Sequence, residues 1–146
     1  MALAVWDLDG CLIDNKFTGD FTENHLARLN DPPNQKAIEW FRKQSVFLKM
    51  MVLTARPWSL LEVTQSWLER QNIRADLVFC RPVEVLHHCP PTIQAGWKRE
   101  VLLKISSRIL LHDDQLEVLR VCCSLPNVSG ALVCRMTTSL QYSKNW

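Results

Sequence analysis

Carboxylate side chains follow two separate apolar segments of the chain at close spacing. Asp7 and Asp9 come directly after the first apolar run, with one residue between them, and Asp113 and Asp114 come after a later run. Several carboxylates packed together repel one another unless a cation neutralises them, and an all-oxygen set of ligands suits Mg²⁺. The sequence therefore predicts a magnesium site, provided that the fold brings the two segments together.

A hydroxyl group and two cations complete this candidate set. Thr54 and Arg56 follow another apolar run, and Lys98 lies on a predicted helix. A threonine hydroxyl and backbone amides can hold phosphate oxygens, while lysine and arginine offset the charge that builds in a transition state. One carboxylate can attack phosphorus to form an aspartyl-phosphate, and a second can protonate the leaving oxygen and later activate water. The set as a whole is suited to phosphoryl transfer.

The elements that position these residues are predicted from the alternation of apolar runs and amphipathic segments. This alternation favours an α/β fold, with a parallel sheet of about five strands and helices on both faces. The expected strands are Ala2–Trp6, Val46–Leu53, Ala75–Cys80, Ile109–His112 and Val128–Cys134. The expected helices are Gln35–Gln44, Trp58–Gln71, Gln94–Ser106 and Leu116–Cys123. Ligands bind at the carboxyl ends of strands in such a sheet, so the candidate residues are expected to meet in one crevice.

Composition limits the class of protein. The chain has 146 residues, of which 47% are apolar and 22% charged, with a net charge of +2. We expect one domain over residues 1–146, and the balanced charge does not by itself indicate a nucleic-acid-binding surface. The sequence shows neither a secretory signal nor the roughly 18 apolar residues that span a membrane. We therefore expect a cytoplasmic protein whose six cysteines are free thiols; its oligomeric state is open.

Four short motifs resemble those of the haloacid dehalogenase (HAD) superfamily of phosphotransferases. In chain order they are DLDG at Asp7–Gly10, LTAR at Leu53–Arg56, GWKREVL around Lys98 and LLHDDQ at Leu110–Gln115. The first motif alone is weakly specific, because two acids and a glycine occur in many turns. Four motifs in order, each placed at a predicted strand end or helix, are much more specific. The resemblance extends from Val5 to about Val133.

The resemblance implies a role for each charged residue. Asp7 would be the nucleophile, Asp9 the general acid and base, and Lys98 the cation that holds the phosphoryl group. Asp7, the backbone carbonyl of Asp9, and Asp113 would bind Mg²⁺, with Asp114 close by. Lys98 is favoured over Lys104, the later lysine of this segment, because a helix antiparallel to the strands presents only its early turn at their carboxyl edge.

The resemblance also implies a substrate-binding set, which consists of Gly10, Thr54, Ala55 and Arg56. The LTAR motif is similar to the TGR or SGR motif of polynucleotide 3′-phosphatases, where the arginine contacts substrate, and the paired acids resemble the fourth motif of those enzymes. A basic rim is then expected from Arg56, Arg81, Lys98 and Arg99. This favours 3′-phosphate ends of nucleic acid or nucleotides. Similar motifs occur in enzymes for small metabolites, so a metabolite or phosphoprotein phosphatase is the alternative; a non-catalytic binding module is disfavoured because every catalytic position is filled.

HAD phosphatases often carry a cap domain, but here the intervals between motifs are mostly occupied by predicted core elements. We therefore expect a protein without a large cap, in which only Asn15–Asp31 could form a small flap. Such an open cleft suits a large substrate with an exposed phosphate. Cys11 stands where the family usually has threonine, and a small buried residue is the preferred interpretation.

Other polar and aromatic residues have a structural interpretation. His112 is expected to finish its strand rather than to tune Asp113. The segment His87–Cys89 lacks the spacing of a zinc site. The tryptophans Trp40, Trp58 and Trp67 are interpreted as packing residues, whereas Trp97, beside Lys98, is a candidate for stacking on a substrate ring.

Overall fold

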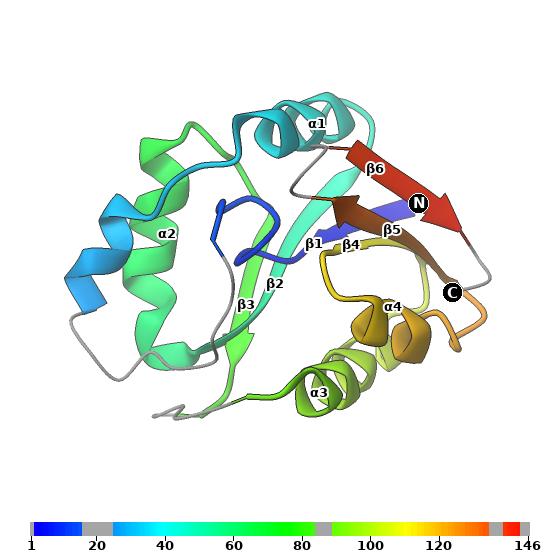
Figure 1. Ribbon diagram of the computed structural model, residues 1–146. Helices are drawn as coiled ribbons and strands as arrows, with labels where there is room; N and C mark the ends of the chain where they lie inside the picture. The colour runs from blue at the N-terminus through cyan, green and yellow to red at the C-terminus, as the bar shows by residue number, and fades with distance from the viewer. Residues whose placement is uncertain (1, 16–24, 84–88, 135–138, 144–146) are drawn as a thin grey trace.

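One six-stranded sheet forms the centre of the molecule (Figure 1). The structure is a computed structural model that describes residues 2–15, 25–83, 89–134 and 139–143. Along the sheet the strand order is β3-β2-β1-β4-β5-β6; neighbours among the first five are parallel, and β6 is antiparallel to β5. The strands are β1 (Ala2–Trp6), β2 (Lys49–Pro57), β3 (Leu77–Arg81), β4 (Arg108–Asp113), β5 (Val128–Cys134) and β6 (Ser139–Ser143). The predicted α/β class is confirmed, with one more strand than expected.

Helices cover both faces of the sheet (Figure 1). They are α1 (Gln35–Ser45), α2 (Leu61–Arg70), α3 (Pro91–Leu103) and α4 (Leu116–Cys122), with 3₁₀ helices η1 (His25–Asn30) and η2 (Trp58–Leu60). One apolar core lies between the sheet and α1 and α2, and a second lies between the sheet and α3 and α4. Successive side chains of β1 point to opposite faces of the sheet, so Ala4 and Trp6 pack in the first core and Val5 packs in the second. Burial on both faces explains why this strand is uniformly apolar.

Several elements begin or end elsewhere than predicted, and two of these changes affect the candidate site. Strand β2 continues to Pro57, so that the LTAR segment lies within the strand; an irregular register against β3 occurs between Thr54 and Pro57. Helix α3 begins at Pro91, three residues earlier than predicted, because proline is well suited to the first turn of a helix. As a result, Lys98 lies in the middle of α3 rather than in an early turn.

The described segments between strands contain only core helices and short 3₁₀ helices, which agrees with the expected absence of a large cap. Of the proposed flap, Asn15 and 25–31 are described, and 16–24 lie outside the described residues, as do His87 and His88. The six cysteines are free. No described helix combines the length and the apolar character needed to cross a membrane.

His112 belongs to the core and is held as a neutral imidazole. Its ring stacks on Trp6 with a centroid distance of 4.0 Å, and its Nδ1 lies 3.1 Å from the carbonyl oxygen of Val5, to which it donates. The amide Nε2 of Gln44 donates to Nε2 of His112 across 2.8 Å, while Oε1 of Gln44 accepts from the Trp6 indole. Burial lowers the pKa of His112 to about 4. A second proton would also place two donors against each other at Gln44.

We expect His112 to make the fold sensitive to acid. Because its pKa is lower in the folded than in the unfolded protein, the unfolded state binds more protons between about pH 6.5 and 4. His112 should therefore cost about 3 kcal/mol of unfolding free energy as the pH falls through this range. Denaturant titrations of the wild type and His112→Phe at several pH values test this, because phenylalanine retains a ring but cannot titrate. Parallel pH profiles for the two proteins would contradict the prediction.

Candidate active site

The candidate residues lie at the carboxyl edge of the three strands β2, β1 and β4. Asp7 directly follows β1, and its backbone N–H donates to the carbonyl oxygen of His112 on β4 across 2.9 Å. Asp113 is the last residue of β4, and Thr54 lies in β2 on the other side of β1. The parallel register therefore brings together residues that are widely separated in the sequence.

Lys98 connects two of these acids. Its Nζ lies 2.8 Å from Oδ1 of Asp7 and 2.7 Å from Oδ2 of Asp113, and its side chain is fully buried. Burial alone would lower the pKa of Lys98, but the charges of Asp113 and Asp7 outweigh it and raise the pKa. Lys104, the alternative considered from the sequence, is an exposed residue at the C-terminal end of α3. The geometry thus places Lys98, and not Lys104, among the acids.

Negative charge exceeds positive charge in this group. Asp7, Asp113 and Asp114 face the single ammonium of Lys98, which leaves two negative charges without a partner in the group. Burial raises the pKa of Asp7 well above its ordinary value, and the charges of Asp113 and Asp114 raise it further. Burial and the charge of Asp113 raise the pKa of Asp114 to about 7. A divalent cation would cancel this excess charge.

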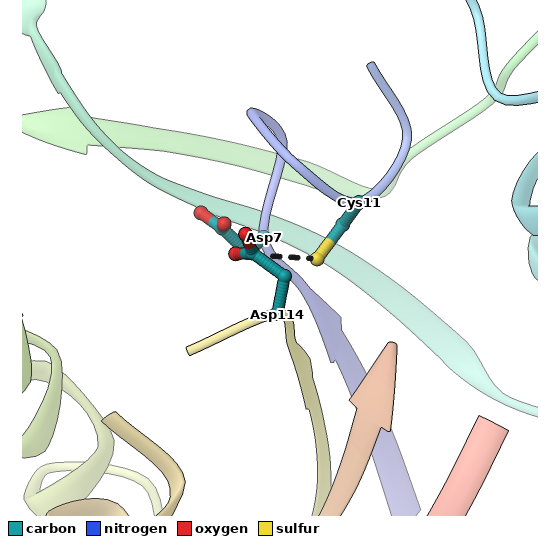
Figure 2. A group of neighbouring side chains, drawn as sticks. All are labelled: Asp7, Cys11 and Asp114. Atoms are coloured by element: carbon teal, nitrogen blue, oxygen red, sulfur yellow. Dashed lines mark hydrogen bonds between the residues drawn. The ribbon is translucent and has the colours of Figure 1, made fainter. Parts of the chain in front are cut away.

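The donor atoms in this group fit such a cation. Ligand atoms of Asp7, Cys11 and Asp114 all lie within 4.8 Å of one another, and Figure 2 shows the two carboxylates side by side with the sulfur of Cys11 directed at them. Asp113, another expected ligand, lies beside this group and accepts one hydrogen bond on each oxygen, from Lys98 and from the backbone N–H of Gln115 across 2.9 Å. The carboxylates of Asp7 and Asp114 suit Mg²⁺. Burial raises the pKa of the Cys11 thiol, which keeps it protonated and a weak ligand for a hard cation.

Asp9 belongs to a second charged group and is separate from Lys98. The guanidinium of Arg56 donates from Nε to Oδ2 of Asp9 and from Nη2 to Oδ1, each across 2.8 Å. Asn15 also donates to Oδ1 of Asp9 across 3.4 Å. Asp9 is 2% exposed and Arg56 is fully buried. The bidentate pair fixes the plane of the Asp9 carboxylate.

Arg56 therefore does not lie on an exposed basic rim, contrary to the expectation from the sequence. Lys98, a second member of that rim, is also fully buried. Arg81 and Arg99 are half-buried, and they donate to Cys89 Sγ at 3.0 Å and to Ser124 Oγ at 3.2 Å. The physical reason is that a buried cation is stable only beside carboxylates, and this chain supplies carboxylates to both buried cations.

Thr54 and Ala55, two members of the expected substrate-binding set, lie inside β2. Thr54 is 1% exposed, and its Oγ1 accepts a hydrogen bond from the backbone N–H of Arg56 across 3.2 Å. Ala55 is 3% exposed and packs against Cys89 and Val83. The hydroxyl of Thr54 thus supports the local turn of the strand, where the register against β3 is irregular.

Gly10, the remaining member of that set, is required by close approach of the backbone to Asp114. Its φ of +83° lies in the left-handed region, and a Cβ at this position would stand 2.2 Å from Oδ2 of Asp114. A side chain would therefore both strain the backbone and displace an acid of the candidate metal group.

We expect Gly10→Ala to lower the unfolding free energy by about 1–3 kcal/mol from backbone strain, with an additional steric cost. The variant Asp114→Ser removes the carboxylate that Cβ would contact. Combining the two substitutions should then cost less than the sum of the single effects, because only the backbone strain remains. Urea denaturation of the four proteins measures this coupling, and strictly additive losses would contradict the contact.

The tryptophans differ in exposure. Trp67 is fully buried, as expected, whereas Trp58, directly after β2, is 53% exposed. The expectation that Trp58 packs in the core is therefore wrong. Trp97 stacks on Phe79 with a centroid distance of 6.0 Å and packs against the second core, so that its ring already has a protein partner. The sequence pattern predicts an α-helix at Trp58, but the chain there forms a short 3₁₀ helix. The helical spacing of the tryptophans therefore does not indicate that Trp58 is exposed.

The fold, with acids after β1 and at the end of β4 and a lysine on the intervening helix α3, is the HAD-like fold. Solved structures with this fold include a chain of the Pnkp1/Rnl/Hen1 complex, with a TM-score of 0.71 and 20% identity over 90% of this protein and 45% of that chain. A second structure, of the Pnkp1/Rnl/Hen1 RNA repair complex, gives a TM-score of 0.63 and 21% identity over 82% of this protein and 38% of that chain. The protein thus spans less than half of the length of those chains.

Two further structures share the fold over most of their own length. The D,D-heptose 1.7-bisphosphate phosphatase from B. bronchiseptica, complexed with magnesium and phosphate, gives a TM-score of 0.60 at 14% identity, covering 90% of this protein and 80% of that chain. The HAD domain of the effector protein Lem4 from Legionella pneumophila gives 0.59 at 11% identity, covering 89% and 84%. No protein-family model and no curated protein matches the sequence. The likeness confirms the fold that the four motifs predicted.

Proposed function

We propose that the protein is a Mg²⁺-dependent phosphomonoester hydrolase that acts through an aspartyl-phosphate on Asp7. The observation that carries the proposal is the division of the charged residues into two groups. Asp7, Lys98, Asp113 and Asp114 form a group with excess negative charge, and Asp9 lies in a separate group with its own cation. A nucleophile beside a cation site and a distinct acid are the parts that this reaction requires.

In the proposed reaction, a carboxylate oxygen of Asp7 forms a bond to phosphorus while the bond between phosphorus and the leaving oxygen breaks. Asp9 gives its proton to that oxygen. Water then attacks the aspartyl-phosphate and passes a proton to Asp9, which releases inorganic phosphate and restores Asp7. Mg²⁺, held by Asp7 and Asp114, would supply positive charge to the phosphoryl oxygens. Lys98 supplies a second positive charge and holds Asp7 in place.

The contacts of Asp9 with Arg56 are compatible with this role. A carboxyl group offers about four lone-pair sites, of which Arg56 and Asn15 occupy three, and the remaining site can carry the proton that Asp9 gives to the leaving oxygen. Thr54 and the adjacent backbone amides, with Gly10 and Ala55, form the proposed phosphate-binding segment. Since Arg56 is fully buried, we assign it to Asp9 instead of to the substrate.

For the substrate we propose 3′-phosphate ends of nucleic acid or nucleotides, in the cytoplasm. Two observations support this choice: the likeness in fold to chains of an RNA repair complex, and the exposed indole of Trp58 beside the LTAR segment. An aromatic face of this kind can stack on a base. A small metabolite is the second candidate, favoured by the likeness to a heptose bisphosphate phosphatase that covers most of both chains.

The substrate proposal is tested with a 3′-phosphorylated oligonucleotide, a nucleoside 3′-monophosphate, a sugar phosphate and p-nitrophenyl phosphate, each with Mg²⁺. We expect the oligonucleotide to have the highest kcat/KM. Trp58→Ala should lower that value about 5- to 150-fold, because stacking on one base contributes roughly 1–3 kcal/mol, while Trp58→Phe retains most of it.

The matched control is Phe47→Ala, because Phe47 is 84% exposed but precedes β2 and so lies at the opposite, amino edge of the sheet. It should leave all four substrates unaffected. If Trp58→Ala reduces hydrolysis of p-nitrophenyl phosphate as much as that of the oligonucleotide, stacking is excluded. A sugar phosphate with the highest kcat/KM would establish the metabolite candidate.

A further inference from the structure

Asp31 is a buried acid that no motif includes, yet it contacts the cation that holds Asp9. It follows η1 directly and is 7% exposed. Its Oδ2 accepts a hydrogen bond from Nη2 of Arg56 across 2.8 Å, and the same Nη2 donates to Asp9. Arg56 is therefore shared between two carboxylates that lie far apart in the sequence.

We infer that Asp31 is a positioning residue for Asp9, and that it acts by fixing the guanidinium of Arg56. The inference rests on the proposed role of Asp9 as general acid and base. A guanidinium is planar and its donors have fixed directions, so a partner on one side determines the direction of the donors on the other. Thr64 on α2 supports the same orientation, because its Oγ1 accepts from Nη1 of Arg56 across 3.2 Å.

Asp31 is itself held firmly enough to serve as this reference point. Its carbonyl oxygen accepts from the indole of Trp67 across 2.9 Å, and its backbone N–H donates to the carbonyl oxygen of Arg28 across 3.2 Å. Arg28 also pairs with Oδ1 of Asp31 at 3.4 Å. The backbone of Asp31 is thus bound to the side chain of Trp67 on α2 and to the backbone of Arg28 in η1. A substitution of the Asp31 side chain leaves both of these contacts in place.

Charge balance gives a second reason why Asp31 matters. Asp9 and Asp31 together face Arg56 and Arg28, so this second group is neutral, unlike the group around Lys98. Without Asp31, Arg56 would lose the carboxylate that shares its Nη2 donor with Asp9, and the direction of that donor would no longer be fixed from the side opposite Asp9. The donors would then no longer hold Asp9 in the direction in which it must meet the leaving oxygen.

The consequence for catalysis depends on the leaving group. An alkoxide leaves poorly and needs the proton of Asp9, whereas p-nitrophenolate leaves readily without one. General acid catalysis contributes roughly 10²–10⁴-fold in rate where it is needed. Misdirection of Asp9 should therefore reduce hydrolysis of an alkyl phosphate much more than hydrolysis of p-nitrophenyl phosphate, with the loss in kcat and not in KM.

The experiment measures kcat and KM for thymidine 3′-monophosphate and for p-nitrophenyl phosphate in three full-length proteins: the wild type, Asp31→Asn and Asp31→Ala. We expect Asp31→Ala to lower kcat for thymidine 3′-monophosphate at least about tenfold more than kcat for p-nitrophenyl phosphate, and Asp31→Asn to have a smaller effect because its carbonyl can still accept from Arg56. Ile38→Val, a buried apolar change in α1, is the control for lost stability. Equal losses on the two esters, or a loss in KM alone, would overturn the inference.

A second measurement does not depend on activity. The Nε–H of Arg56, buried between carboxylates, should exchange slowly with solvent in the wild type and much faster in Asp31→Ala, as observed by ¹⁵N NMR of the arginine side chains. Unchanged exchange would refute the positioning role even in an active enzyme. Slow exchange that is lost in the variant, in a protein that hydrolyses neither ester, would instead identify the proposed function as the part that failed.

Discussion

Asp7→Asn is expected to abolish phosphomonoester hydrolysis without loss of the fold. The amide has the shape of the carboxylate but cannot attack phosphorus, and it removes both one negative charge and one candidate ligand of Mg²⁺. Burial and the neighbouring acids already raise the pKa of Asp7, so a neutral side chain at this position relieves repulsion in the folded state. We therefore expect Tm to be unchanged or higher while turnover is lost.

Steady-state hydrolysis of p-nitrophenyl phosphate, with and without excess chelator, measures this effect, and thermal unfolding of the same samples measures the fold. The wild type should lose activity in chelator and regain it with Mg²⁺. Val118→Ala, a buried change in α4, serves as the control that lowers Tm without removing a charged residue. Robust turnover by Asp7→Asn, or by the wild type in chelator, would refute the mechanism.

Lys98→Met is expected to have the largest effect on stability, a loss of about 3–5 kcal/mol at neutral pH, because it leaves buried acids without their cation. The effect should depend on pH with a definite sign. Without Lys98, the pKa of Asp7 rises further in the folded state, because the charge of Lys98 no longer lowers it, so the folded state binds more protons than the unfolded chain. Stability of the variant should accordingly fall as the pH rises from about 4 toward 7.

Two changes, added Mg²⁺ and a second substitution, should restore stability to the Lys98→Met protein if this interpretation is correct. Mg²⁺ would replace part of the missing positive charge, and Asp7→Asn in the Lys98→Met background would remove one of the repelling acids. Denaturant titrations in the presence and absence of Mg²⁺ test both. Lys104→Met, which changes an exposed lysine of the same segment, should be nearly neutral and serves as the matched control. A Lys98→Met protein as stable as the wild type at neutral pH would show that the acids are not strongly coupled to this lysine.

The position of the candidate site could be predicted from the sequence because the sheet is parallel. Apolar runs followed by acids identify the carboxyl ends of β1 and β4, and their neighbouring positions in the sheet bring Asp7 close to Asp113. The choice of Lys98 agrees with the geometry, but the reason given for it does not. Because α3 begins at Pro91, Lys98 lies in the middle of the helix and not in an early turn. Its long side chain reaches the acids from there.

The contacts among charged side chains could not be predicted in the same way. A motif indicates that Arg56 is near the site, but not whether it faces solvent, since that depends on which buried acids the rest of the fold supplies. Asp31 belongs to no motif, and only the packing of η1 against α2 places it beside Arg56. Strand β6 was missed although its five residues alternate polar and apolar side chains, because a run with only two apolar residues is too short to predict a strand; pairing with β5 stabilises it.

The sharing of Arg56 between two acids also has a consequence for the divergence of related chains. A neutral residue in place of Asp31 would leave a buried guanidinium with one carboxylate, and loss of Arg56 would leave two buried carboxylates without a cation; both intermediates are unfavourable. Positions 9, 31 and 56 are thus expected to change together or not at all. Among homologues in which position 56 is not arginine, we expect position 31 to have lost its acid, and that covariation would be visible across a family even where overall identity is low.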